Sequence, residues 1–143
     1  MTKILIINGP NLNMLGTREP EIYGYKTLAT IEEMCREKAE ERGWDIDFRQ
    51  SNHEGNLVDW AQEAGLYFDG LIINAAAYTH TSIALHDALK MLHIPIIEVH
   101  LSNPKDRESF RHNSYIETLA KTVVTGNGAE GYIMALDNLA TYL

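Results

Sequence analysis

The 143-residue sequence contains a single cysteine, Cys35, so no disulfide can form within the chain. It also lacks any apolar run near the roughly 20 residues that a membrane-spanning helix needs. The N-terminal run Ile4–Ile7 is too short for a signal-peptide core. Basic residues are few, 12 Lys and Arg against 20 Asp and Glu, and the formal charge of −8 repels phosphate backbones. We therefore expect a cytoplasmic protein in a reducing compartment, with neither a nucleic-acid nor a membrane partner.

Length and composition are those of an ordinary globular protein. Hydrophobic residues make up 45% of the chain and charged residues 22%, which is close to the average for folded domains. A domain holds roughly 100–200 residues. We therefore predict one domain over residues 1–143 that buries its core without disulfides.

Short apolar runs alternate with amphipathic segments along the chain. The predicted strands are Lys3–Asn8, Asp45–Gln50, Gly70–Asn74, Pro95–His100 and Lys121–Gly126. The predicted helices, in which apolar residues recur at helical spacing, are Thr27–Arg42, Asn52–Leu66, Thr81–Leu92 and Ala129–Leu143. Three strands are apolar without alternation, which is typical of parallel strands covered on both faces. We predict an α/β fold, a flavodoxin-like three-layer sandwich with a five-stranded parallel sheet.

Polar residues rich in Asn, His and Ser follow four of the predicted strands. These clusters are Asn8–Asn11, Gln50–Asn52, Asn74–His80 and His100–Asn103. In open parallel sheets, ligands bind beyond the carboxyl ends of the strands. The sequence therefore predicts a ligand site at this edge of the sheet.

The segment between the first strand and the first predicted helix is a loop of about eighteen residues, and loops of that length are usually functional or disordered. It contains Arg18 and Tyr23 but neither of the Gly-rich patterns that bind phosphates. Two interpretations stay open. The loop is either a surface segment with an incidental Arg and Tyr, or a lid that carries a cation and a phenol into the site.

Other charged and imidazole side chains lie at the end of the fourth predicted strand or after the third and fourth strands. Glu98 and His100 are two residues apart, so on a strand they point to the same side. Such a pair either serves structure or prepares the imidazole for general acid catalysis. Arg107 and Arg111 suit either a small carboxylate or surface ion pairs, and His80 suits either packing or ligand binding.

Six stretches carry a resemblance that covers essentially the whole chain. They are Asn8–Gly16 with Arg18–Pro20 and Tyr23-Gly24; Gln50–Asn52 with Glu54-Gly55; Ala77–Ser82; Ile97–Asn103; Phe110–His112 with Ser114-Tyr115; and Gly126–Gly128 with Gly131-Tyr132. Together they resemble type II 3-dehydroquinate dehydratases. Two positions depart from the commonest family pattern. Ala75-Ala76 stands where the family often has Pro-Gly or Ala-Gly, and His86 stands where it often has Arg.

The resemblance implies an enzyme that dehydrates 3-dehydroquinate to 3-dehydroshikimate, in the shikimate route to aromatic amino acids or in quinate breakdown. It implies an anti elimination through an enolate, with no metal and no other cofactor. Tyr23, as phenolate, would take the proton beside the ketone, and Arg18 would lower the cost of forming that anion. His100, oriented by Glu98, would protonate the departing hydroxyl. Asn11 would stabilise the enolate oxygen.

The resemblance also implies how the substrate is held and how the protein assembles. The implied substrate-binding residues are Asn74, His80, Asp87, Leu101, Ser102 and Arg111. In the family, Asp87 reaches its site from a neighbouring subunit, so a homo-oligomer is expected, with twelve subunits built from trimers.

Four other classes of protein fit the sequence less well. A metal hydrolase would need a His or Cys ligand motif, and the six histidines form none. A receiver domain would need acidic residues at the strand ends, and a flavin-binding module would need a phosphate loop rich in Ser, Thr and Gly. The dehydratases that form a Schiff base are barrels of about 250 residues, which this chain is too short to build.

Overall fold

The computed structural model describes residues 1–143 and contains one parallel sheet at its centre. The strands are β1 (Lys3–Asn8), β2 (Asp45–Gln50), β3 (Gly70–Asn74), β4 (Ile96–His100) and β5 (Thr122–Thr125). Their order across the sheet is β2-β1-β3-β4-β5, and every neighbouring pair is parallel. This order is that of flavodoxin-like folds, so the predicted fold class is confirmed.

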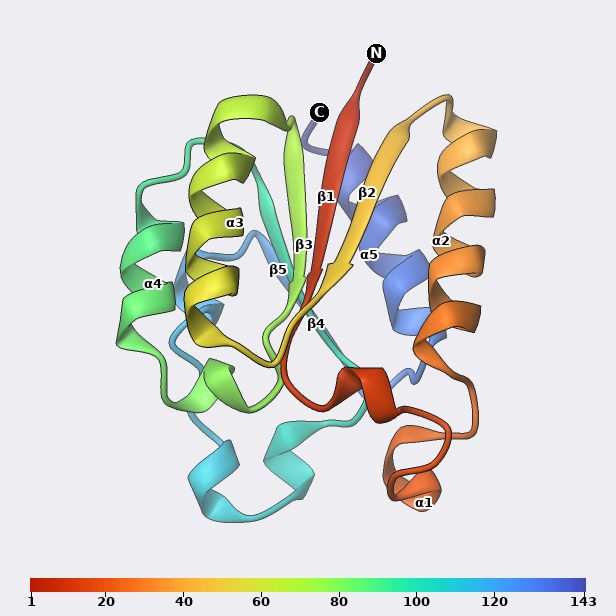
Figure 1. Cartoon of the computed structure of the whole chain (residues 1–143), viewed down its shortest axis with the longest axis vertical. Helices are drawn as coiled ribbons and strands as arrows, with labels where there is room; N and C mark the ends of the chain where they lie inside the picture. The colour runs from red at the N-terminus through yellow and green to blue at the C-terminus, as the bar shows by residue number, and fades with distance from the viewer.

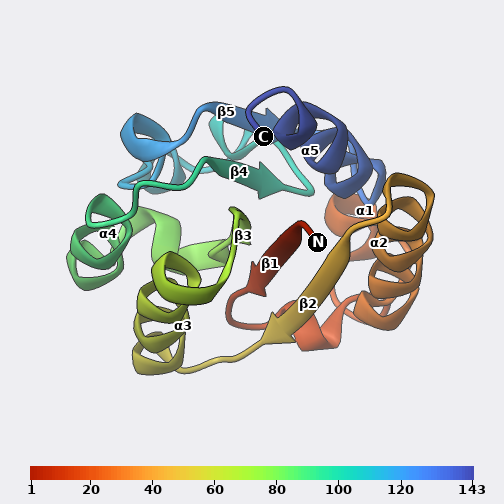
Figure 2. The same cartoon turned by 90° about the horizontal axis from the view of Figure 1, so that it is seen from above.

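Four helices cover the two faces of the sheet. Figures 1 and 2 show α2 (Leu28–Arg42) and α5 (Glu130–Ala140) on one face, and α3 (Glu54–Tyr67) and α4 (Ile83–Lys90) on the other. The fifth helix, α1 (Pro20–Tyr23), is a single turn within the long loop after β1. None of the helices combines the length and the apolar character that a membrane-spanning segment requires.

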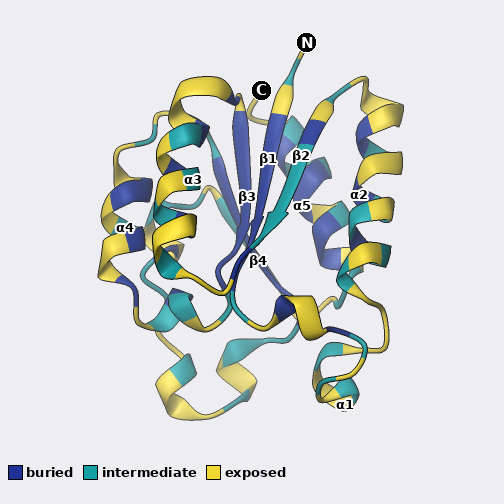
Figure 3. Ribbon diagram, in the orientation of Figure 1, coloured by how far each residue is buried: buried dark blue, intermediate teal, exposed yellow.

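The sheet separates two hydrophobic cores, because successive side chains of a strand point to opposite faces. On β1, Ile4 and Ile6 pack with residues of α2 and α5, whereas Leu5 and Ile7 pack with residues of α3 and α4. All four side chains are fully buried. Figure 3 shows the resulting pattern, in which buried residues line the sheet and the inner helix faces. Burial on both faces explains why these strands are apolar without alternation.

The ends of the elements differ modestly from the prediction. β1, β2 and β3 have the predicted bounds, whereas β4 begins one residue later, at Ile96. The helices are shorter than their apolar patterns. For example, α4 begins at Ile83 because the Ser82 hydroxyl accepts a hydrogen bond from the backbone N–H of Leu85 and so caps the helix.

The strand register brings the polar ends of the strands to one level. Asn8, the last residue of β1, pairs with Gln50 of β2 on one side and with Asn74 of β3 on the other. The segments that follow these strands therefore meet at the carboxyl edge, below the sheet in Figure 1, where α1 also lies.

Candidate active site

A cavity at the carboxyl edge gathers most of the predicted site residues. Nine of the eleven line it: Asn11, Arg18, Tyr23, Asn74, His80, His100, Leu101, Ser102 and Arg111. Glu98 lies behind His100 and lines a neighbouring cavity. Asp87 is exposed on α4 and does not line the cavity. One protomer therefore assembles the predicted site except for Asp87.

The lid loop brings Tyr23 into the cavity at the end of α1. Pro20 stands in the first turn of this helix, where a missing backbone N–H does no harm. Gly24 ends the helix with a φ of 84°, a left-handed conformation that glycine adopts without strain. The loop thus places a phenol and, through Arg18, a cation at the site.

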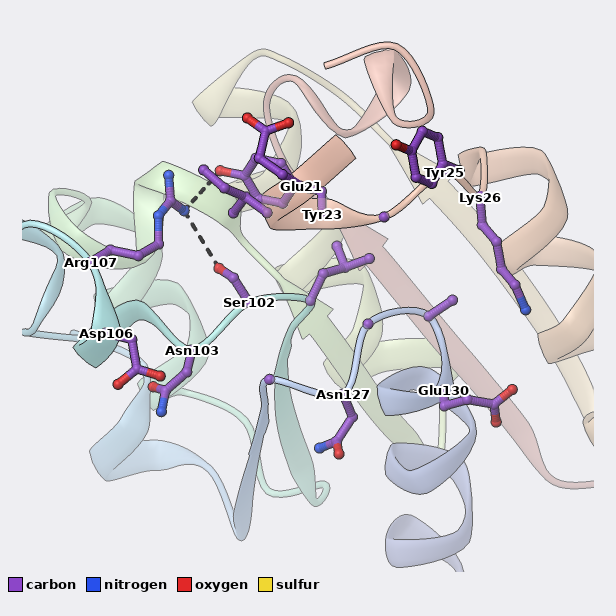
Figure 4. A pocket seen from close by; sticks show the side chains of 16 residues that line it. Glu21, Tyr23, Tyr25, Lys26, Ser102, Asn103, Asp106, Arg107, Asn127 and Glu130 are labelled. Atoms are coloured by element: carbon purple, nitrogen blue, oxygen red, sulfur yellow. Dashed lines mark hydrogen bonds between the residues drawn. The ribbon is translucent and has the colours of Figure 1, made fainter. Parts of the chain in front are cut away.

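Two guanidinium groups lie against the Tyr23 side chain. The central carbon of the Arg18 guanidinium is 4.7 Å from the centre of the phenol ring, and that of Arg107 is 5.2 Å away. Nη1 of Arg107 also donates a hydrogen bond of 2.8 Å to the Tyr23 hydroxyl oxygen. Figure 4 shows this bond and a longer one, of 3.5 Å, from Arg107 to the Ser102 hydroxyl. Both cations are placed to stabilise a phenolate.

Tyr23 and Arg107 also lie between two neighbouring cavities and line both of them. The cavity described above lies on one side, and an open cleft of about 670 Å³ lies on the other. Figure 4 shows this cleft between the lid, the segment after β4 and the start of α5. The contact between the Tyr23 hydroxyl and the Arg107 guanidinium therefore helps to separate the cavity from the open cleft.

His100 and Glu98 form a buried hydrogen-bonded pair at the end of β4. His100 Nε2 lies 2.6 Å from Glu98 Oε2, which also accepts hydrogen bonds from the hydroxyls of Thr79, at 2.9 Å, and Ser114, at 2.8 Å. The Glu98 side chain is fully buried, and burial raises its pKa. The hydrogen bonds from His100, Ser114 and Thr79 outweigh that effect and hold the pKa below its usual value. Glu98 is therefore a carboxylate near neutral pH, and it holds by Nε2 an imidazole that also lines the cavity.

His80 is held in one tautomer by the backbone. Its Nδ1 lies 2.8 Å from the carbonyl oxygen of Asn113, which can only accept, so Nδ1 carries the proton. Burial lowers the pKa of His80, and the positive charges of His100 and Arg111 lower it further. The neutral ring then offers Nε2 as a hydrogen-bond acceptor, which suits a ligand hydroxyl.

Sequence reasoning left Arg107 out of the site. Its position beside Arg111 marked it only as a cation suited to a carboxylate or to a surface ion pair. Its bond to Tyr23 joins residues 84 positions apart, and no spacing rule reports a contact of that range. The charge was the only signal, since Arg107 is one of few cations near a predicted strand end.

An imidazole–carboxylate pair and a phenol flanked by guanidinium groups define an acid–base enzyme built on a flavodoxin-like sheet. Comparison with known proteins agrees. The model of the family Dehydroquinase class II matches residues 2–140. A 3-dehydroquinate dehydratase of Rhizobium meliloti (strain 1021) is 59% identical over 136 residues, which is 95% of this chain and 92% of the relative.

Solved structures give the same result. The type II dehydroquinase from Butyrivibrio crossotus DSM 2876 superposes with a TM-score of 0.95 at 47% identity, covering 97% of each chain. The type II dehydroquinase from Propionibacterium acnes superposes with a TM-score of 0.94 at 41% identity, covering 99% of this chain and 97% of that one. The chain belongs to the class II dehydroquinase family.

Proposed function

We propose that the chain dehydrates 3-dehydroquinate to 3-dehydroshikimate, a step of the shikimate pathway, by an anti elimination through an enolate. The observation that supports this route is the pairing of two groups in one cavity. Tyr23 with its guanidinium groups is a base whose anion is stabilised, and His100 with Glu98 is an acid. An elimination needs one of each.

In the first step, the Tyr23 phenolate removes a proton from the carbon beside the substrate ketone, and the electron pair moves onto the ketone oxygen. Ionising a free tyrosine near neutral pH costs about 1.36 kcal/mol for each pH unit below its ordinary pKa of about 10. Arg107, which bonds the hydroxyl oxygen directly, and Arg18, which lies over the ring, are placed to stabilise the negative charge of the phenolate. Asn11 lines the same cavity and stabilises the enolate oxygen.

In the second step, the enolate re-forms the ketone and expels the hydroxyl, which leaves as water with a proton from His100. The Glu98 carboxylate holds the imidazole by Nε2 and stabilises its protonated form. Asn74, His80, Arg111 and the backbone at Leu101-Ser102 line the cavity and hold the substrate's hydroxyls and carboxylate. Arg111 is suited to the carboxylate, because guanidinium groups bind carboxylates in a bidentate manner.

The remaining substrate contact, Asp87, comes from a second copy of the chain. Within one protomer it is exposed and is not among the residues that line the cavity, which supports a contact made across an interface. We propose a homo-oligomer, with the dodecamer of trimers that the resemblance implies. Mixing Asp87→Ala with Tyr23→Phe subunits after dissociation is expected to restore part of the activity, because some sites then receive both wild-type residues. No recovery in the mixture would refute the shared site.

We further propose that residues 1–143 are one catalytic domain that acts in the cytoplasm without a metal or other cofactor. Each chemical step above is assigned to a side chain of this chain. Activity is therefore expected to survive exhaustive dialysis against EDTA, and a loss that zinc or magnesium restores would contradict the proposal.

The direct test is to mix the protein with 3-dehydroquinate and to follow the conjugated enone of the product by ultraviolet absorbance. We expect absorbance to grow in proportion to enzyme concentration. Borohydride added with substrate is expected to leave activity intact, because no imine forms. Inactivation with a covalent adduct would show a Schiff-base route instead.

A further inference from the structure

Tyr132 is a fully buried residue that has no place in the reaction described above, although it belongs to the last of the six sequence stretches. It lies on α5, on the opposite side of the sheet from α3 and α4. Its hydroxyl donates a hydrogen bond of 2.6 Å to Asn8 Oδ1 and accepts one of 3.0 Å from Asn74 Nδ2. These asparagines end the neighbouring strands β1 and β3 and pair with each other in the sheet. Tyr132 therefore contacts a cavity-lining residue, Asn74, from behind.

Two backbone groups set the direction of this chain of hydrogen bonds. At one end the carbonyl oxygen of Arg49, which can only accept, receives Asn8 Nδ2 at 3.0 Å. At the other end the backbone N–H of Ala76, which can only donate, lies 3.1 Å from Asn74 Oδ1. Asn8 must therefore present its oxygen to Tyr132, and Asn74 must present its NH₂ group. The hydroxyl, with one proton, can satisfy both only by donating to Asn8.

These hydrogen bonds fix the orientation of the Asn74 side-chain amide. If this amide flipped, its oxygen would face the hydroxyl oxygen of Tyr132 and its NH₂ group would face the N–H of Ala76. Both contacts would then be repulsive, in a setting where the Asn74 side chain is buried. Burial also raises the pKa of Tyr132 above its usual value, so the hydroxyl keeps its proton across the working pH range. The second N–H of Asn74 has no partner among the protein's hydrogen bonds and stays free for a ligand in the cavity.

We propose that Tyr132 is a positioning residue for substrate binding: its hydroxyl holds the Asn74 amide so that an N–H, rather than the carbonyl oxygen, meets the substrate. The inference rests on the proposed function only in that Asn74 binds the substrate. It predicts that the group which Asn74 contacts is a hydrogen-bond acceptor, such as a hydroxyl or carbonyl oxygen.

The test is Tyr132→Phe, which removes one oxygen atom and keeps the ring in the core. We expect KM for 3-dehydroquinate to rise about tenfold, the effect of one lost hydrogen bond, while kcat and the pH profile change little. KM does not depend on how much of the sample is folded, so lower stability alone would reduce kcat per milligram without moving KM. Asn8→Ala provides a second variant, since without its acceptor the hydroxyl can turn toward Asn74, and the same rise in KM is expected.

Tyr78→Phe is the matched control, because the Tyr78 hydroxyl donates to the backbone carbonyl of Asn52 at 2.9 Å and does not line the cavity. It is expected to leave KM unchanged. In the double variant Tyr132→Phe with Asn74→Ala, KM should match that of Asn74→Ala alone, because the hydroxyl acts through Asn74.

Additive effects in the double variant, or an unchanged KM in Tyr132→Phe, would overturn the inference while leaving the proposed function intact. Failure of the wild-type protein to form the enone would refute the proposed function itself.

Discussion

The Tyr23 hydroxyl accepts a 2.8 Å hydrogen bond from Nη1 of Arg107, although the two residues are 84 positions apart in the sequence. Arg18, only five residues from Tyr23, lies over the face of the ring and not at the hydroxyl. The two cations therefore have different geometries toward the same phenol. In the proposed reaction, negative charge on the phenol oxygen would meet Arg107 directly, whereas Arg18 would act across the ring.

We expect Arg107→Gln to lower kcat by about ten- to a hundredfold near neutral pH, since hydrogen bonds to charged groups contribute about 1.5–3 kcal/mol. Lys105→Gln is the matched control: it removes one positive charge two residues away and does not line the cavity that Tyr23 lines. Steady-state kinetics of both variants check this, and equal losses of kcat in the two would show that the loss reflects overall charge and not the hydrogen bond to Tyr23.

Glu98→Gln should keep the fold and lower kcat by about 10²- to 10⁴-fold, the usual range for general acid–base catalysis. The amide fills the same buried space but lacks the negative charge that stabilises a protonated His100. A normal circular dichroism spectrum with unchanged turnover would assign the pair to structure alone.

The same substitution has a defined effect on acid stability. The pKa of Glu98 in the folded state lies below its ordinary value of 4.5. The charged form therefore stabilises the fold above about pH 4.5, and this contribution is lost as the pH falls through the lower, folded-state pKa. Denaturant unfolding should show a difference in stability between wild type and Glu98→Gln that is constant above that pH and shrinks below it. A pH-independent difference would contradict the assignment.

His80 should titrate below its ordinary pKa of 6.5, because burial and the charges of His100 and Arg111 disfavour its protonated form. Removing one of those charges with Arg111→Gln is expected to move its midpoint upward. Nuclear magnetic resonance titration of the imidazole carbons measures both values. A midpoint that is higher in the wild type than in the variant would contradict this prediction, because it would show that Arg111 stabilises the protonated form of His80.

Gly9→Ala should destabilise the protein by several kcal/mol and abolish activity. A Cβ at this position would lie 2.6 Å from the carbonyl carbon of Ala75 and closer still to its oxygen, and backbone atoms cannot yield cheaply. The ends of β1 and β3 would have to separate, which would displace Asn74. Gly55→Ala on α3, where nothing lies within 4 Å, is the control and should be neutral or stabilising by up to about 1 kcal/mol. Thermal unfolding of both variants measures the difference.

The departure at Ala75-Ala76 has a structural reading. Ala76 has a φ of 52°, in the left-handed region where glycine is preferred, which explains why the resembling family often places Gly there. The backbone N–H of Ala76 donates a hydrogen bond to Asn74 Oδ1, which helps to hold this unfavourable backbone conformation. The sequence showed that the residue was small, and only the backbone angle showed why.

The sequence by itself determined the sheet, because β1, β3 and the start of β4 are apolar without alternation, and a parallel sheet covered by helices on both faces buries such strands. It also determined the edge of the site, since ligands of such sheets bind at the carboxyl ends of the strands, and it marked the Glu98–His100 pair through a period of two. The tertiary structure alone decided which partners these side chains have. Arg107 reaches Tyr23, Ser114 reaches Glu98 and Tyr132 reaches Asn74 through folding that brings distant segments together. Residue spacing in the sequence does not predict such contacts, because they depend on how loops and helices pack at the edge of the sheet.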